Sequence, residues 1–365
     1  MNTRIKIALV GCGRISKNHL KAIIYHYKIS TLSAICDTNQ EMLNSAQDLI
    51  SQEKNKFNVS DEAPIEYKDL QSLMHDIRIK KININLVVLA TPSGLHAEQT
   101  ILAAKHKINV CTEKPMAVKY KDGCQMIEVC KENNVKLFVV KQNRFNSTLQ
   151  LLKKQVELGR FGKIALVSVN VFWQRPQSYY DQDEWRGTLE LDGGALMNQA
   201  SHYVDLLDWL IGPVESVSAS IATISRNIEA EDTAAMQIKW KNGTLGTLGV
   251  TMLTYPKNLE GSITILGENG TVKIGGTAVN KIEKWQFKDE NKYDLEVANS
   301  SYESDDVYGK GHYPYYKNMI NNIKNNEEAI CTGNEGLKSL ELLEASYRSA
   351  KEEKVIKLPL LKSHH

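Results

Sequence analysis

The chain has 365 residues, of which 42% are apolar and 24% charged, the balance of an ordinary globular protein of about two domains. It carries 45 Lys and Arg against 43 Asp and Glu, so its formal net charge of +2 creates no global field for nucleic acid or an anionic membrane. This composition excludes a disordered chain, a collagen-like repeat and a small disulfide scaffold.

Targeting signals are not expected in this sequence. No stretch is apolar for long enough to form a transmembrane helix, and the N-terminal segment lacks the apolar core of a signal peptide. The 6 cysteines include no C-x-x-C pair, and Cys12, Cys36 and Cys111 lie in or beside apolar runs. We therefore expect a cytoplasmic protein with buried free thiols and without a metal cluster.

Residues 1–145 alternate continuous apolar runs with helix-like stretches. The expected strands are Ile5–Val10, Leu32–Cys36, Ile65–Tyr67, Leu86–Ala90, Asn109–Thr112 and Lys136–Val140. The expected helices are His19–His26, Glu41–Ser51, Leu70–His75, Ala97–His106 and Lys121–Asn133. Such a pattern indicates an α/β fold with a parallel sheet covered on both faces, which predicts a doubly wound Rossmann domain over 1–145. The polar stretch Ser51–Pro64 is expected to be a surface loop or a frayed helix end.

After residue 146 the pattern changes to successive strands joined by short turns. The expected strands are Ile164–Trp173, Val214–Ile224, Thr233–Trp240, Thr244–Leu253, Ser262–Leu266, Thr271–Ile274 and Ile282–Phe287. The expected helices are Leu149–Leu158, Asn198–Leu210, Tyr315–Asn325 and Glu335–Glu353. This predicts a C-terminal α+β domain over 146–365 with a large, mostly antiparallel open sheet, which binds substrate. Because another subunit commonly covers such a sheet, we expect a homo-oligomer, with a tetramer favoured.

A dinucleotide-binding motif follows the first strand. Residues Gly11–Ser16 read G-x-G-x-x-S, in which Gly11 permits the tight turn and Gly13 lets a pyrophosphate approach the backbone. Asp37 ends the second strand, near the place expected for an acid that grips the ribose hydroxyls, and it would repel a 2′-phosphate, which favours NAD over NADP. The alternative is an ordinary pair of glycines in a strand–turn–helix unit. The predicted cofactor contacts are Gly11, Gly13, Arg14, Ile15 and Asp37.

Two further strand ends carry polar residues at the edge of the sheet that lines a cofactor crevice. Proline restricts the preceding residue to extended geometry, which aims Lys114 toward the nicotinamide half of the site. There Lys114 can hydrogen-bond a substrate hydroxyl and stabilise a developing alkoxide, although an isolated lysine is more often a surface residue. His96 either contacts the cofactor or caps a helix. The predicted cofactor contacts here are Thr91, Pro92, His96, Glu113 and Lys114.

The stretch 192–205 is the densest in functional residue types. Asn198 and His202 are four residues apart, which places them on one face of an α-helix, with Asp205 also on that side. His202 can accept a proton from a substrate alcohol, and Asn198 can orient the ring or the substrate. The alternative for His202 is a structural histidine that caps its own helix.

Together these motifs resemble the glucose–fructose oxidoreductase/inositol dehydrogenase family over nearly the whole chain. The resemblance is carried by Gly11–Ser16, by Thr91-Pro92 with His96, by Glu113-Lys114-Pro115 and by the segment with Gly193-Gly194, His202 and Asp205. It implies that Lys114 and His202 are the catalytic pair, supported by Asn198. The family usually has Asp at the position of Asn198, so no carboxylate stands there for a proton relay.

A narrower resemblance links the chain to the UDP-N-acetylglucosaminuronate 3-dehydrogenases of bacterial surface-polysaccharide and lipopolysaccharide synthesis. It is carried by the segments Val140–Asn146, Arg175–Tyr180, Trp185–Thr188 and Leu191–Gln199. Arginine binds carboxylates and phosphates in a bidentate manner, and aromatic rings stack on sugar or uracil, although each aromatic residue is as readily explained by core packing. The predicted substrate contacts are Arg144, Arg175, Tyr179, Trp185, Arg186, Asn198 and Gln199.

The resemblance implies oxidation of the sugar 3-hydroxyl by NAD, with the NADH re-oxidised by 2-oxoglutarate in some members of the group. Three alternatives stay open: a dehydrogenase of a free sugar or inositol, an NAD-dependent glycosidase, and a non-catalytic NAD-binding sensor. The arginines argue against a neutral polyol, and a pure sensor needs neither Lys114 nor His202.

Overall fold

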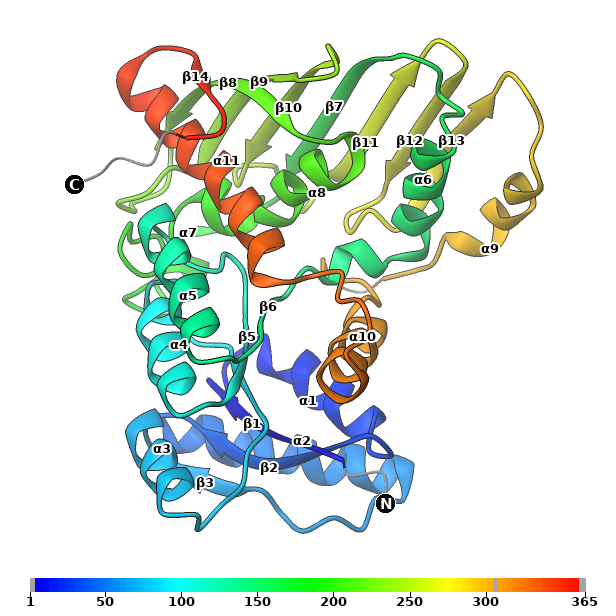
Figure 1. Ribbon diagram of the computed structural model, residues 1–365. Helices are drawn as coiled ribbons and strands as arrows, with labels where there is room; N and C mark the ends of the chain where they lie inside the picture. Colours follow the sequence, from blue (N-terminus) through cyan, green and yellow to red (C-terminus); the bar gives the residue numbers. More distant parts are fainter. Residues whose placement is uncertain (1–3, 305–306, 361–365) are drawn as a thin grey trace. The chain divides into compact units, whose positions relative to one another are not determined.

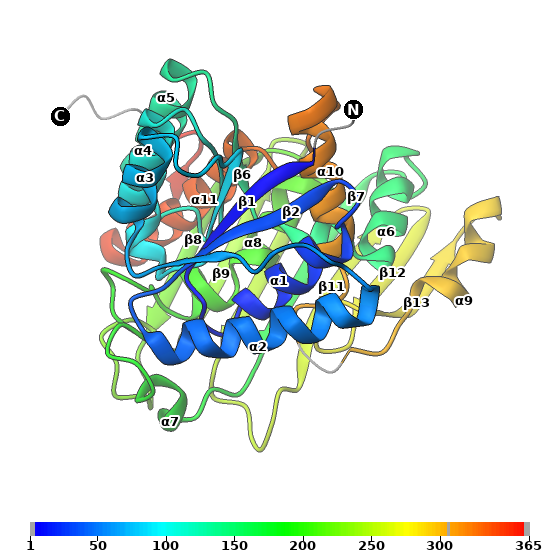
Figure 2. The ribbon, with the colours of Figure 1, turned by 90° about the horizontal axis from the view of Figure 1, so that it is seen from below.

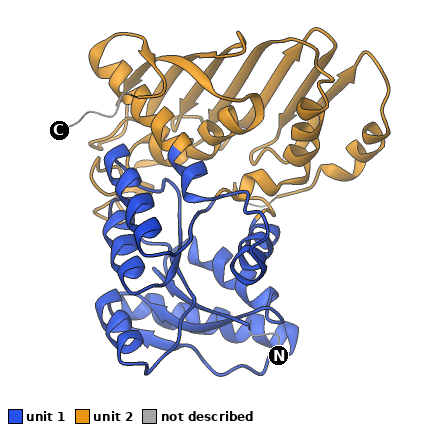
Figure 3. Ribbon diagram, viewed as in Figure 1, with its two compact units in different colours: residues 1–140, 312–337 blue, residues 141–311, 338–365 orange. Residues whose placement is uncertain are grey.

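The computed structural model describes residues 4–304 and 307–360. The chain forms two compact units, coloured separately in Figure 3. Unit 1 takes its residues from 1–140 and 312–337, and unit 2 from 141–311 and 338–365. This division differs from the predicted boundary in two ways, because the chain leaves unit 1 at residue 140 rather than 145 and returns to it for residues 312–337.

Unit 1 contains a parallel six-stranded sheet in the order β3-β2-β1-β4-β5-β6. Figure 1 labels β1, β2, β3, β5 and β6 of this sheet. Its strands are β1 Ile5–Val10, β2 Ser30–Cys36, β3 Ile65–Tyr67, β4 Leu86–Leu89, β5 Asn109–Thr112 and β6 Leu137–Val139. Its helices are α1 Ser16–Tyr25, α2 Gln40–Phe57, α3 Leu70–Arg78, η1 Ser93–Leu95, α4 His96–Lys105, α5 Tyr120–Glu132 and α10 His312–Asn325. Figure 2 shows α1 and α2 together on one side of β1 and β2, with α3, α4 and α5 grouped on the other. The predicted doubly wound Rossmann fold is confirmed.

Helix α10 explains why residues 312–337 belong to unit 1. It packs on α1, and Tyr315 and Tyr316 are fully buried there. The Tyr316 hydroxyl lies 2.8 Å from His19 Nδ1, and the Tyr315 hydroxyl lies 3.1 Å from Cys111 Sγ. An amphipathic helix pattern does not reveal which sheet the helix covers, so the sequence predicted this helix without its location.

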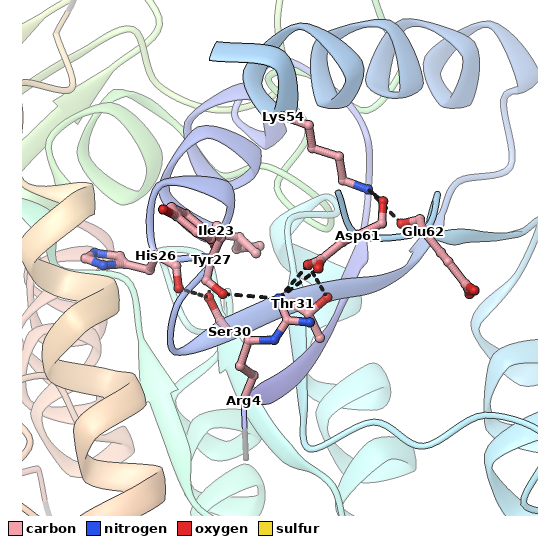
Figure 4. Close-up of polar contacts among 9 residues, drawn as sticks. All are labelled: Arg4, Ile23, His26, Tyr27, Ser30, Thr31, Lys54, Asp61 and Glu62. Carbon is pink, nitrogen blue, oxygen red and sulfur yellow. Dashed lines mark hydrogen bonds and ion pairs between the residues drawn. The ribbon is translucent and has the colours of Figure 1, made fainter. Parts of the chain in front are cut away.

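Helix α2 is longer than predicted and takes in part of the polar stretch assigned to a loop. The residues after it are held by ionic and hydrogen bonds (Figure 4). Lys54 Nζ donates to the carbonyl oxygens of Asp61 and Glu62, at 3.0 and 2.7 Å. The Asp61 carboxylate accepts from the Arg4 guanidinium at 2.7 Å and from Thr31 Oγ1 at 3.0 Å. Polar contacts thus fix the position of this segment. The spacing of apolar residues, on which the sequence prediction relied, carries no information about such contacts.

Unit 2 contains an eight-stranded sheet in the order β13-β12-β11-β7-β10-β9-β8-β14. Its strands are β7 Ile164–Phe172, β8 Val214–Ala222, β9 Thr233–Trp240, β10 Leu245–Thr251, β11 Glu260–Gly267, β12 Gly270–Gly275, β13 Lys281–Phe287 and β14 Ile356–Lys357. Only the pairing of β7 with β10 is parallel among the described strand pairs of this sheet. The predicted, mostly antiparallel sheet is therefore confirmed.

Helices cover one face of this sheet and leave the other open. The helices of unit 2 are η2 Gln142–Phe145, α6 Ser147–Glu157, α7 Gln177–Tyr180, η3 Ala195–Gln199, α8 Ser201–Ile211, η4 Lys292–Glu296, α9 Val297–Ser300 and α11 Gly333–Glu352, whose first residues belong to unit 1. Along β9, Met236, Ile238 and Trp240 are buried, whereas the alternate residues Gln237 and Lys239 are exposed. The Trp240 indole donates to the Leu207 carbonyl of α8 at 3.3 Å, which places α8 on the covered face.

The structure buries the thiols of Cys12, Cys36 and Cys111, as predicted. Burial is the main cause that raises the pKa of Cys12 and of Cys36 to about 12, so these thiols stay protonated at neutral pH. Over residues 4–304 and 307–360, no helix has the length and hydropathy needed to cross a membrane.

Candidate active site

The loop between β1 and α1 has the geometry of a dinucleotide cradle. Gly11 has a φ of +92°, and a Cβ at this position would lie 2.5 Å from the Ala90 carbonyl oxygen, so only glycine fits. A Cβ on Gly13 would meet no protein atom within 4 Å, which leaves its backbone open to a ligand. Ser16 closes the turn, because its hydroxyl and its amide donate to the Gly13 carbonyl, at 2.6 and 3.1 Å. The residues present therefore fit a bound pyrophosphate.

Asp37 stands where β2 ends, beside this loop. Its two carboxylate oxygens accept backbone hydrogen bonds from Cys12 at 2.7 Å and from Asn39 at 2.8 Å. These bonds fix the orientation of a half-buried carboxylate next to the glycine turn. An acid held in this way fits the ribose hydroxyls of NAD. Arg14 is exposed and Ile15 half-buried at the start of α1.

His96, a predicted cofactor contact, is the first residue of α4. Its side chain is fully buried, and its ring nitrogens lie 3.0 Å from the carbonyl oxygens of Thr91 and Pro115. Burial lowers the pKa of His96, which favours the neutral ring. Its position therefore favours a structural role, in which the ring holds the loop after β4 against the turn after β5. Thr91 Oγ1 donates to Gln99 at 2.6 Å, and Thr91 and Pro92 are half-buried.

Glu113 also turns inward rather than toward open space. It is 6% exposed, and one carboxylate oxygen lies 3.0 Å from His19 Nε2 while the other accepts the backbone N–H of Lys114 at 3.0 Å. Burial alone would raise the pKa of Glu113, but the hydrogen bond to His19 and the charges of His19 and Lys114 hold it at about 2. The ionised carboxylate therefore stabilises the turn that carries Lys114. The Lys114 residue itself is half-buried. The pattern around Glu113 gave no sign of His19 as its partner.

In unit 2, the predicted helix with Asn198 and His202 is divided into two parts. Residues Ala195–Gln199 form the π-helical turn η3, and α8 begins at Ser201. The Ala200 N–H donates to the Ala195 carbonyl at 2.8 Å, which is the five-residue bond of a π-helix. The spacing of Asn198 and His202 therefore crosses a change of helix type, and the one-face argument for a continuous α-helix does not hold. The Asn198 amide donates to Asp192.

His202 is 7% exposed and lies beside a buried ionic cluster. The amide nitrogen of Gln142 lies 3.1 Å from His202 Nε2, which orients the ring. One turn further along α8, Asp205 accepts two hydrogen bonds of 2.8 Å from Arg144 and lies 3.3 Å from Lys141 Nζ. Burial would raise the pKa of Asp205, but the charges of Arg144 and Lys141 outweigh it and hold the pKa at about 2.

This cluster changes the interpretation of Arg144. Its side chain is fully buried and pairs with Asp205 in a bidentate manner, whereas an arginine that receives a substrate carboxylate must present its guanidinium to a cavity. Its position favours a structural role. The sequence analysis assigned Arg144 to the substrate, whereas the structure pairs both Lys141 and Arg144 with Asp205.

The structure brings the other predicted substrate residues of unit 2 together. The Arg175 Nε donates to Gln199 Oε1 at 3.1 Å, and the Gln199 amide donates to the Tyr179 hydroxyl at 3.2 Å. The Arg186 guanidinium lies 4.7 Å from the centre of the Tyr179 ring and 4.8 Å from that of Trp185. We call these five residues the Arg–aromatic cluster. All five are half-buried, so the cluster combines cationic and stacking groups that a ligand can reach.

Unit 1 is a Rossmann unit with the glycine turn and Asp37, and unit 2 combines helices with a large sheet. This combination is typical of NAD-binding oxidoreductases. Models of one oxidoreductase family match both parts, the NAD-binding Rossmann fold over residues 5–141 and the C-terminal alpha/beta domain over residues 153–358. The chain belongs to this family, the GFO/IDH/MocA oxidoreductases, and is an NAD-dependent oxidoreductase. The predicted family, fold and cofactor are thereby confirmed.

Similar proteins include two WlbA dehydrogenases that were solved in complex with NADH and UDP-GlcNAcA. The one from Bordetella pertussis is 51% identical, with a TM-score of 0.91 and coverage of 99% of each chain. The one from Chromobacterium violaceum is 48% identical, with a TM-score of 0.89 and coverage of 98% of this chain and 97% of that one. The myo-inositol 2-dehydrogenase of Thermotoga maritima is 25% identical over 97% of this chain and 98% of its own length.

Proposed function

We propose that the protein oxidises the 3-hydroxyl of UDP-N-acetyl-D-glucosaminuronic acid to a ketone, with NAD⁺ as the oxidant. Its similarity to two dehydrogenases that bind NADH and UDP-GlcNAcA, at 51% and 48% identity over nearly their whole length, supports this substrate. The observation that carries the choice of an anionic sugar nucleotide over a neutral polyol is the Arg–aromatic cluster of unit 2.

The chemistry of the cluster suits such a substrate. A uronic acid carries one carboxylate and the diphosphate carries further negative charge, and Arg175 and Arg186 offer planar guanidinium groups that bind both. Tyr179 and Trp185 offer ring faces to the sugar or the uracil. A free sugar or inositol has no charge for these arginines to bind.

The reacting groups act on one hydroxyl. Bound NAD⁺ would supply the acceptor for the hydride from the third carbon of the sugar. His202 accepts the proton of the 3-hydroxyl, and Lys114 hydrogen-bonds the same oxygen and stabilises its developing negative charge. Asn198 positions the substrate, held by its bond to Asp192. The carbon–oxygen single bond becomes a double bond, and the hydride and the proton account for both hydrogens lost.

The test is mass spectrometry of UDP-N-acetylglucosaminuronic acid incubated with the purified protein, NAD⁺ and 2-oxoglutarate. We expect the sugar nucleotide to lose two hydrogens. Formation of 2-hydroxyglutarate in the same reaction would establish in addition that 2-oxoglutarate re-oxidises the NADH. Loss of two hydrogens without 2-hydroxyglutarate would keep the dehydrogenase and discard the recycling. An untouched sugar nucleotide with protein shown to bind NAD(H) would overturn the substrate.

We also propose that the open face of the unit 2 sheet is covered by a second copy of the chain, with a tetramer favoured. The exposed leucines Leu166 of β7, Leu245 of β10 and Leu266 of β11 support this, because they lie in register beside one another and form an apolar row. Light scattering of the eluted protein would give its mass, and a monomer at micromolar concentration would contradict the proposal.

A further inference from the structure

The carboxyl group of Glu231, two residues before β9, is a buried acidic group without a role in the proposed chemistry. Its side chain is 3% exposed. One oxygen, Oε1, accepts hydrogen bonds from the Leu196 backbone N–H at 2.7 Å and from the Tyr347 hydroxyl at 2.8 Å. The other oxygen, Oε2, is buried and has no hydrogen-bond partner among the described residues.

These contacts converge on the first residues of η3. The Ala195 N–H donates to the Glu231 carbonyl at 2.8 Å, and the Leu196 N–H donates to the Glu231 side chain. The next amide, that of Met197, donates to the Tyr347 hydroxyl at 3.2 Å. The carbonyl and the side chain of Glu231, with the hydroxyl of Tyr347, thus bind three consecutive amides that a helix start leaves without an intrahelical partner.

The glycine at 194 belongs to the same arrangement. A Cβ on Gly194 would overlap the Glu231 carboxyl group, so the close approach of the acid to this turn requires glycine. A carboxyl group that packs against a backbone, with one oxygen bonded and one without a partner, is most stable when neutral. In agreement, burial raises the pKa of Glu231, with the nearby Asp192 as a further cause.

We propose that Glu231 and Tyr347 are positioning residues that hold the π-helical turn η3, and through it place Asn198 and Gln199 for the substrate and His202 for proton transfer. The inference rests on the proposed function of these three residues. A turn of this kind is rarer than an α-helical one and is frequent at functional sites. Because a misplacement of about 1 Å in a catalytic constellation lowers rates by about 100-fold, loss of these contacts reduces turnover without removing a reacting group.

The test compares Tyr347→Phe, Glu231→Ala and Glu231→Gln in the full-length protein. Phenylalanine removes one hydroxyl and alanine removes the carboxyl group, and we expect each to lower kcat by about 10- to 100-fold. NADH affinity, measured by fluorescence, should stay within about twofold. Glutamine keeps a neutral oxygen acceptor for Leu196 and Tyr347, so it should restore kcat to within about threefold of the original chain. Glu344→Ala, which removes a carboxylate of α11 that pairs with Arg348, is the matched control.

Hydrogen exchange supplies a readout that does not depend on turnover. We expect faster exchange of the amides in 195–199 in Tyr347→Phe and Glu231→Ala, and unaltered exchange in Glu344→Ala. Unchanged kcat in both variants, unchanged exchange in both, or a Glu231→Gln protein as impaired as Glu231→Ala would overturn the inference. An unaltered chain that leaves the sugar nucleotide untouched would refute the proposed function instead.

Discussion

At the scale of single residues, the environment of His202 determines what its substitution should do. The ring is nearly buried, is oriented by Gln142, and lies one turn before Asp205, whose carboxylate is occupied by Arg144 and Lys141. Since Asp205 is already paired, it does not provide a second base. We expect His202→Asn to lower kcat by roughly 100- to 10,000-fold, the usual contribution of acid–base catalysis, while NADH affinity is kept.

The measurement is steady-state oxidation of the sugar nucleotide, followed by NADH absorbance, together with NADH titration of each protein. His75→Asn is the matched control, because His75 is an exposed residue of α3. Turnover of His202→Asn equal to that of His75→Asn would remove His202 from the chemistry and leave the structural interpretation of this histidine.

At the scale of elements, substitutions of the two glycines in the β1–α1 turn distinguish an effect on folding from an effect on cofactor binding. Gly11 has a positive φ, and a Cβ there would lie 2.5 Å from Ala90, whereas Gly13 faces open space. We expect Gly11→Ala to lower both the melting temperature and the NADH affinity. Gly13→Ala should melt within about 1–2 °C of the original chain, because its methyl group meets no protein atom, yet bind NADH at least about tenfold more weakly.

Calorimetry and fluorescence titration of the two variants give both quantities, and each variant is the control for the other. If Gly13→Ala kept full NADH affinity, the pyrophosphate would not lie against this turn. If Gly11→Ala were as stable as the original chain, the close approach to Ala90 would not limit the residue at position 11.

The elements that the sequence predicted well depend on local patterns. Continuous apolar runs, the G-x-G turn and the spacing to Asp37 mark β1, β2 and the loop between them without any distant contact. The contact between His19 and Tyr316 joins residues 297 positions apart, and no local pattern reports it. The turn η3 was likewise missed, because a helical period of hydrophobic residues does not distinguish a π-helical bond from an α-helical one. Arg144 was assigned to substrate because its partner Asp205 is distant in sequence.

At the scale of the whole molecule, each unit contains a buried carboxylate whose ionised form is favoured by the folded state. Glu113 in unit 1 and Asp205 in unit 2 each have a pKa of about 2. In an unfolded chain their pKa values are about 4.3 and 3.9. The unfolded state therefore binds protons more readily than the folded state at acidic pH, and both groups favour folding wherever they are ionised.

The sign of this linkage predicts acid sensitivity in both units. Stability from Glu113 and Asp205 is complete above about pH 5 and is lost as pH falls toward the folded-state pKa of about 2. We expect the melting temperature by calorimetry to decline gradually below about pH 6.5, because burial lowers the pKa of histidines such as His96 and the unfolded chain takes up those protons first. It should fall more steeply below about pH 5, where Glu113 and Asp205 become protonated in the unfolded chain. Asp205→Asn should lower stability at pH 7 by about 3–5 kcal/mol, because Lys141 and Arg144 would remain buried without a counter-charge, and should flatten the acid dependence. A melting temperature of the original chain that stayed constant down to about pH 3 would show that neither carboxylate is stabilised by its partners in the folded state.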